Sequence, residues 1–215
     1  MKTPFTVEQF LEVFKAYNLA VWPMQIILYM IAVTVIVFLF ARSGYKGRVI
    51  FGLLAFLWFW MGLVYHIFFF TAINKAAWVF GCIYFIQVAL FLYYGAWNNK
   101  INGSFDNNLF GVTGILFLLY GLVIYPLLGN FLGHNYPSAP TFGLPCPTTV
   151  FTFGILLMFQ SRIPWQIIVI PLLWSVIGFF AAINFGIKED IGLLVTGITG
   201  FVMILVRNKQ LKTIP

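Results

Sequence analysis

Residues 133–152 read GHNYPSAPTFGLPCPTTVFT and separate two long apolar regions of the chain. This stretch contains one of the 2 histidines, His134, and one of the 2 cysteines, Cys146. Pro140, Pro145 and Pro147 interrupt helical structure, because proline lacks a backbone N–H group and clashes with the preceding turn. A polar, kinked segment between apolar helices is a typical place for a binding site in a membrane protein. The stretch therefore predicts where such a site lies.

The composition of the whole chain predicts a membrane protein. Of its 215 residues, 62% are hydrophobic and only 8% are charged, and the mean hydropathy is +0.98. A soluble domain of this length needs a charged surface, which so few charged residues cannot supply. The net charge is +7, but the basic residues are scattered through short loops. We therefore expect the lipid bilayer as a partner, and no nucleic acid.

Seven apolar segments are each near the length that a bilayer requires. They are residues 23–41, 49–71, 77–96, 109–129, 147–161, 165–186 and 191–206. Before them, residues 1–22 contain an amphipathic pattern over 5–21, with a capping box at Thr6 and Gln9. The predicted fold is an all-α membrane protein: one domain, residues 1–215, of seven transmembrane helices preceded by an N-terminal interfacial helix. That first helix is either an anchor for the first span or a lid.

The basic residues predict the orientation of these spans. If the spans alternate, eight of the 12 Lys and Arg residues lie on the side of the first loop, which contains Arg42, Lys46 and Arg48. The remaining four are Lys2, Lys15, Lys75 and Lys188. Because basic loops stay in the cytoplasm, the N-terminus is predicted outside and the C-terminus in the cytoplasm.

Two segments of the chain are similar to each other. Residues 69–74 read FFTAIN and residues 179–184 read FFAAIN, and each ends a span that runs outward. This similarity fits two parallel three-helix units joined by the fourth span, an arrangement found in some transporters. Chance similarity in a sequence rich in Phe, Ala and Ile is the alternative.

The span that follows the proline-rich stretch is short. Residues 147–161 rise about 22 Å at 1.5 Å per residue, whereas the hydrocarbon core is about 30 Å thick. Arg162 can extend its side chain to the inner interface, so the shortfall is expected at the outer end. Local thinning of the bilayer is the alternative. We therefore predict that residues 130–148 form a re-entrant outer loop, which must be buried in protein or line a cavity.

Polar side chains are expected to converge at this depth. His66 lies about 7 Å inside the outer end of its span, Cys82 lies at a similar depth, and Cys146 begins the short span. An ionisable side chain within a membrane usually marks a functional site. The predicted ligand-binding residues are Tyr65, His66, Asn74, His134, Cys146, Thr148, Thr149, Glu189 and Asp190.

Each of these residues has a structural alternative. His66 could bond a backbone carbonyl, and the threonines could satisfy backbone groups near the prolines. Glu189 and Asp190 could stabilise the helix dipole at the start of the last span rather than bind a cation. Cys82 and Cys146 have three alternative roles. They could form a disulfide, remain two inert thiols, or bind a metal ion together with His66. No metal-binding spacing is present, so a metal ion is the weakest of the three, and no other cofactor is indicated.

Three segments carry a resemblance to a known family: residues 4–23, 60–74 and 133–154, together with Glu189 and Asp190. The most specific is PTFGLPCPTT at residues 140–149. The chain resembles a bacterial multi-pass membrane family catalogued only as a domain of unknown function, family 6064. The resemblance implies a single-domain membrane protein and no particular activity.

The leading hypothesis is a bacterial inner-membrane protein that binds, and in its fullest form transports, a small solute or metal ion. Its outward-facing pocket is predicted to be lined by His66, Cys146, Thr148 and Glu189. One alternative, which is less expected, is a membrane-embedded enzyme with His66 or His134 as base or metal ligand and Glu189 or Asp190 as its partner. A structural or accessory subunit is the other alternative, and an oligomer is compatible with the sequence.

Overall fold

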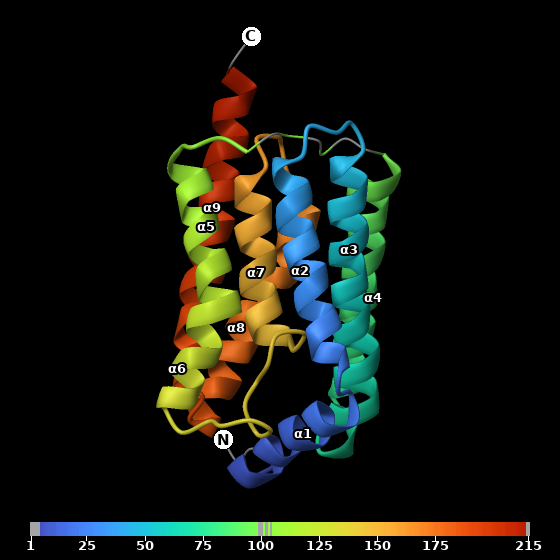
Figure 1. Cartoon of the computed structure of the whole chain (residues 1–215), viewed down its shortest axis with the longest axis vertical. Coiled ribbons are helices and arrows are strands. Elements are labelled where there is room, and N and C mark those ends of the chain that lie inside the picture. Colours follow the sequence, from blue (N-terminus) through green and yellow to red (C-terminus); the bar gives the residue numbers. More distant parts are fainter. Residues whose placement is uncertain (1–4, 99–100, 102, 104, 214–215) are drawn as a thin grey trace.

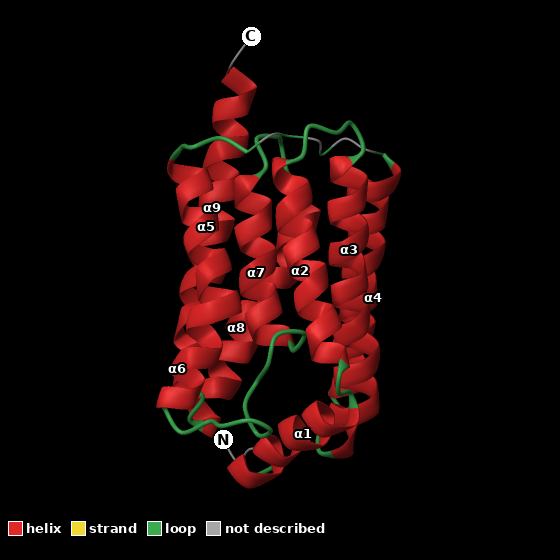
Figure 2. Ribbon diagram, viewed as in Figure 1, coloured by secondary structure: helices red, strands yellow, loops and turns green. Residues whose placement is uncertain are grey.

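The computed structural model describes residues 5–98, 101, 103 and 105–213. Some residues used in the sequence analysis lie outside the described part: Lys2, Pro4, Lys100 and the side chain of Lys212. Helices run side by side, and the two termini lie at opposite ends of the bundle (Figure 1). Within these residues, the helices are joined by loops without a β-strand (Figure 2).

In the part of the chain that the structure describes, five helical segments are long and apolar enough to cross a membrane. The bounds of these segments are Lys46–Ala72, Ala77–Trp97, Leu109–Phe131, Trp165–Phe185 and Lys188–Leu211. The first contains α3 (Lys46–Trp60), the π-helical η1 (Met61–Phe69) and η2 (Phe70–Ala72). The second contains α4 (Ala77–Phe91) and η3 (Leu92–Trp97), and the third contains α5 (Leu109–Leu119), η4 (Tyr120–Ile124) and α6 (Tyr125–Phe131). The last two are α8 (Trp165–Phe185), then η5 (Lys188–Asp190) with α9 (Ile191–Thr213).

Two further helices coincide with predicted spans but are shorter. They are α2 (Met24–Phe40), with 17 residues, and α7 (Pro145–Met158), with 14 residues. A bend of 85° separates α2 from α1 (Val7–Ala20), and this bent pair gives a sixth candidate span when it is counted as one. By length and composition the structure thus supports five or six spans, whereas the sequence predicted seven.

The short helix α7 occupies the centre of the bundle. It packs against α2, α5, α8 and α9, and all its residues except Cys146 are buried. A helix that is apolar on all sides is expected in such a position. Glycine permits a close contact with α5, because a Cβ atom on Gly114 of α5 would lie 2.7 Å from the carbonyl oxygen of Gly154 in α7. A small residue at this interface therefore lets the two helices approach closely.

A buried arginine binds the C-terminal end of α7. Arg207 of α9 donates hydrogen bonds from Nη1 to the carbonyl oxygens of Leu156 and Leu157, at 2.9 and 2.8 Å. The last carbonyl groups of a helix lack partners within the helix and carry partial negative charge, so a cation stabilises them. The cationic side chain therefore binds the C-terminal end of a helix that has no access to water.

The first helix, α1, lies across the opposite end of the bundle (Figure 1). Its predicted capping box is present, because Thr6 Oγ1 accepts a hydrogen bond from the Gln9 N–H and the Gln9 side chain accepts one from the Thr6 N–H. Its amphipathic pattern is also confirmed: Phe14 and Tyr17 are buried, whereas Glu8 and Glu12 are exposed. The helix therefore covers this end of the bundle with its apolar face.

Candidate functional site

The proline-rich loop between α6 and α7 turns back into the bundle. In Figure 1 it runs from α6 past α1 and then rises to the start of α7. Pro140 and residues 142–144 at its end are buried. Gly143 has a φ of 95°, and a Cβ atom there would lie within 2.3 Å of Leu28 Cδ1, so only glycine fits. The end of the loop is thus enclosed by protein, which is the environment that its irregular backbone requires.

Asn18 of α1 holds this loop in place. Its Nδ2 donates hydrogen bonds to the carbonyl oxygens of Pro137 (2.6 Å) and Ala139 (2.8 Å). Its Oδ1 accepts a bond of 2.7 Å from Thr141 Oγ1. One buried side chain therefore joins the first helix to three loop residues. The sequence analysis did not identify this role for Asn18.

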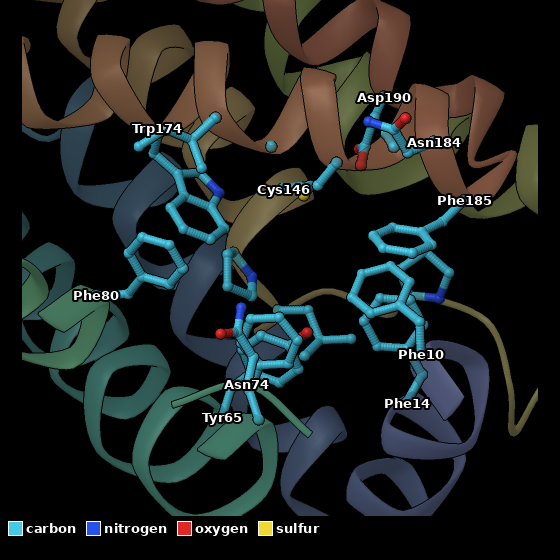
Figure 3. A pocket seen from close by; sticks show the side chains of 18 of the residues that line it. Phe10, Phe14, Tyr65, Asn74, Phe80, Cys146, Trp174, Asn184, Phe185 and Asp190 are labelled. Atoms are coloured by element: carbon cyan, nitrogen blue, oxygen red, sulfur yellow. The ribbon is translucent and has the colours of Figure 1, made fainter. Parts of the chain in front are cut away.

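A cavity of about 230 Å³ lies between α1, α8 and the start of α7. Its walls are mainly aromatic, as ligand pockets often are. The aromatic rings that line it, apart from Tyr125, belong to Phe5, Phe10, Phe14, Tyr65, Phe70, Phe80, Trp174 and Phe185. Figure 3 shows Phe80, Tyr65 and Trp174 on one side, with Phe10, Phe14 and Phe185 on the other. The apolar face of α1 thus supplies part of the wall.

One end of the cavity is polar. The Cys146 thiol lies between the Trp174 indole and the Asp190 carboxyl group (Figure 3). Tyr125 also lines this end, and its hydroxyl donates a hydrogen bond of 2.6 Å to Asp190 Oδ1. The Trp174 Nε1 is buried without a hydrogen-bond partner. Gly178 also lines this end, and a Cβ atom on it would lie 3.6 Å from both Cys146 Sγ and Trp174 Nε1.

Four of the predicted site residues line this cavity: Tyr65, Asn74, Cys146 and Asp190. They come from segments far apart in the sequence, so the predicted convergence occurs for these residues. The two similar segments, residues 69–74 and 179–184, also meet here, since both Asn74 and Asn184 are lining residues. The sequence did not assign Trp174, Tyr125 or the aromatic residues of α1 to the site.

His66 does not line the cavity. It lies on η1, is fully buried, and contacts aromatic rings, with centroid distances of 4.7 Å to Tyr84 and 5.0 Å to Trp174. Neither ring nitrogen has a hydrogen-bond partner, so the expected alternative of a bond to a backbone carbonyl is not found. The Tyr84 hydroxyl is buried without a partner as well. His66 therefore belongs to an aromatic cluster behind the cavity wall.

The threonines of α7 are also outside the cavity. Thr148 Oγ1 accepts a hydrogen bond of 3.1 Å from the Gly143 N–H. Thr152 Oγ1 accepts one of 3.1 Å from Trp58 Nε1 and donates one of 2.8 Å to the Thr148 carbonyl. These bonds satisfy groups around the proline-rich start of α7, as the structural alternative proposed. Thr149 is buried, and its hydroxyl has no partner.

Glu189 and Asp190 face different surroundings. Glu189 is fully buried, and its Oε1 lies 2.9 Å from Nδ1 of His134 in the loop. Gly129 of α6 permits this contact, because a Cβ atom there would lie 3.0 Å from the same oxygen. The pair joins the loop to the start of the last helix. His134 and Glu189 therefore stabilise the surroundings of the cavity, and only Asp190 lines it.

The two cysteines are separate and unbonded. Cys146 lies at the cavity, whereas Cys82 is exposed on the surface of α4. The preceding residue, Gly81, packs against Ile67 and Gly62, so Cys82 points away from the bundle. Among the described residues, no group of three His, Cys, Asp or Glu side chains is placed to hold a metal ion. The structure therefore does not bring together the predicted ligands His66, Cys82 and Cys146.

Over the described residues, the fold and the cavity define an all-helical bundle in which five helices are long and apolar enough to cross a membrane. Residues 7–213 match the family described as "Family of unknown function (DUF6064)", and the chain belongs to this family. The predicted membership of family 6064 is thereby confirmed. No curated protein and no solved structure matches the chain.

Proposed function

We propose that this chain is an integral membrane protein that binds a small organic solute in the cavity beneath α1. The main support is the cavity itself, which has aromatic walls and a thiol and a carboxyl group at one end. Apolar concave sites with a few convergent polar groups are the usual form of small-molecule sites. Neither histidine lines the cavity, so an enzyme that uses His66 or His134 has less support.

The proposed membrane arrangement has seven crossings. The helix α7 is shorter than the bilayer core, but neighbouring helices surround it and separate it from lipid. Termini at opposite ends of the bundle require an odd number of crossings (Figure 1). Large apolar side chains on the outer surface, such as Val37, Leu116 and Val202, are suited to contact lipid.

The distribution of basic residues supports an outward-facing cavity in a bacterial inner membrane. The positive-inside rule places the α1 end of the bundle outside and the Arg207 end in the cytoplasm. The cavity, at the α1 end, then faces outside. Beyond the cavity α7 is buried on all sides, so binding has more support than permeation.

The reactivity of Cys146 tests the cavity directly. In purified full-length protein carrying Cys82→Ser, methyl methanethiosulfonate should modify Cys146 at a rate that mass spectrometry can follow. Ala181 lines the cavity, so Ala181→Trp should fill it and slow the modification several-fold. Ala76→Trp, at an exposed position, is the matched control and should leave the rate unchanged. Equal rates in both variants, or no reaction in any of them, would contradict the proposed site.

A further inference from the structure

We infer that the ligand of this cavity is an organic cation, an amine or quaternary ammonium compound with an apolar body, and that Asp190 is its counter-charge. The inference rests on the proposed function and specifies its ligand class. It is derived from the charges, the rings and the unpartnered donor that line the cavity.

The charge argument begins with Asp190, which is only 4% exposed. Among the described residues, no Lys, Arg or His side chain lines the cavity. The two ion pairs of the described chain, Lys15–Glu12 and His134–Glu189, do not include Asp190. Its neighbours are the Tyr125 hydroxyl, the Cys146 thiol and the backbone-linked Glu189, none of which is a cation. An unpaired buried carboxylate is costly, and a cationic ligand would supply the missing charge.

The aromatic walls favour the same ligand. The face of an aromatic ring carries partial negative charge, and cages of several rings recognise ammonium groups. Rings from α1, η1, α4 and α8 surround this cavity, including Phe10, Tyr65, Phe80 and Phe185. An anionic ligand would meet both the ring faces and the Asp190 carboxylate, so the cavity excludes anions.

The Trp174 indole adds a further requirement. Trp174 is 8% exposed and lines the cavity, and its Nε1 donor has no hydrogen-bond partner other than the neighbouring Cys146 sulfur, which is a weak acceptor. Buried donors are normally paired, so an acceptor from a ligand is expected at this position. A compound with a hydroxyl or ester oxygen close to its ammonium group would satisfy both Trp174 and Asp190.

An inorganic cation fits this cavity poorly. Calcium and magnesium ions require several oxygen ligands, and transition metals require sets of nitrogen, sulfur or oxygen ligands. The described residues offer no group of three His, Cys, Asp or Glu side chains for this purpose. The single carboxylate and the aromatic walls instead match a large, weakly hydrated organic cation.

The experiment compares choline with 3,3-dimethyl-1-butanol, in which carbon replaces the charged nitrogen. Each compound is titrated against full-length Cys82→Ser protein, and protection of Cys146 from methyl methanethiosulfonate gives its affinity. We expect choline to bind about tenfold more tightly than the neutral compound. Asp190→Asn should remove this difference, whereas Asp190→Glu should retain it. Glu189→Gln is the matched control, because Glu189 contacts His134 rather than the cavity, and should also retain it.

The outcomes separate this inference from the proposed function. Equal protection by both compounds, or a preference for choline that survives Asp190→Asn, would overturn the cation inference and leave the cavity intact. If neither compound protects Cys146 while Ala181→Trp still slows the labelling, the cation inference is overturned and the proposed cavity is retained. The comparison of the two compounds needs only the native Asp190, so it holds even if Asp190→Asn fails to fold. If Ala181→Trp has no effect, the proposed function fails as well.

Discussion

The Tyr125 hydroxyl donates a hydrogen bond of 2.6 Å to Asp190 Oδ1, which joins α6 to the start of the last long helix. Both side chains line the cavity, so this bond holds two helical segments together and also fixes the position of the Asp190 carboxyl group in the site. The hydroxyl group is neutral, so this bond positions the carboxyl group and supplies no counter-charge. Asp190 is thereby held at the cavity wall by a neutral donor.

Replacing Tyr125 with Phe should destabilise the protein by about 1–3 kcal/mol, because the buried carboxyl group loses its hydroxyl donor. The free energy of unfolding can be compared in detergent by chemical or thermal denaturation. Tyr93→Phe is the control, since Tyr93 is an exposed residue and its replacement should have little effect. Equal stability of the two variants would show that the Tyr125–Asp190 bond contributes nothing.

Replacing Asn18 with Ala should loosen the contact between α1 and the proline-rich loop. The change removes hydrogen bonds to Pro137, Ala139 and Thr141, and each typically contributes about 0.5–1.5 kcal/mol. Because α1 and the loop cover the cavity, Cys146 should then react faster with a thiol reagent. Asn135→Ala, in an exposed part of the same loop, should not change the rate. An unchanged rate in Asn18→Ala would contradict this role for Asn18.

Replacing Gly114 with Ala should destabilise the bundle by about 1–3 kcal/mol, because the added methyl group overpacks the contact with α7. The new Cβ atom would lie 2.7 Å from the carbonyl oxygen of Gly154 and 2.5 Å from Met158 Cγ. Gly52→Ala is the control in a helix interior, where nothing lies within 4 Å of the added atom. The control should be neutral or slightly stabilising, since alanine favours helix. A similar response of the two variants in thermal denaturation would refute the close α5–α7 contact.

Replacing Arg207 with Met should destabilise the protein by about 1.5–3 kcal/mol, because two charge-assisted hydrogen bonds to the end of α7 are lost. Arg207 lies at the end of α7 opposite the cavity, so the affinity of Cys146-protecting compounds should stay the same. Arg42→Met, at an exposed loop position, should alter neither quantity. A variant of Arg207 as stable as the native protein would mean that relief of the buried charge offsets the lost bonds.

The positions of the helices were largely predictable, because each long helix coincides with an apolar segment of the sequence that is bounded by loop residues. The predicted span 165–186 corresponds to Trp165–Phe185, and 77–96 corresponds to Ala77–Trp97. The short fifth span was also recognised, and α7 is 14 residues long. Length and composition support five or six spans rather than the predicted seven, because α2 and α7 are shorter than the other candidates. A helix that is buried within protein can be shorter than the bilayer core, so length alone does not decide whether α7 is a span.

The site was only partly predictable. The spacing of residues along a helix gives their depth in the membrane, but it gives the direction in which a side chain points less well. The rise per residue placed His66, Cys82 and Cys146 at a similar depth, but only Cys146 faces the cavity. The π-helical turns of η1 change the number of residues per turn, so the direction of His66 does not follow from α-helical spacing. Cys82 faces outward because its neighbour Gly81 makes the helix contact. Adjacent residues on a helix point in different directions, which separates Glu189 from Asp190.

Sided labelling of Cys146 in intact spheroplasts tests the central claim most directly. The reagent is a small, positively charged methanethiosulfonate that does not cross membranes, and the protein carries Cys82→Ser. An outward-facing cavity beneath α1 predicts that Cys146 is modified from outside. A cysteine introduced by Ser43→Cys, in the loop assigned to the cytoplasm, should react only after permeabilisation. The opposite pattern, with residue 43 labelled in intact spheroplasts and Cys146 protected until permeabilisation, would contradict the account.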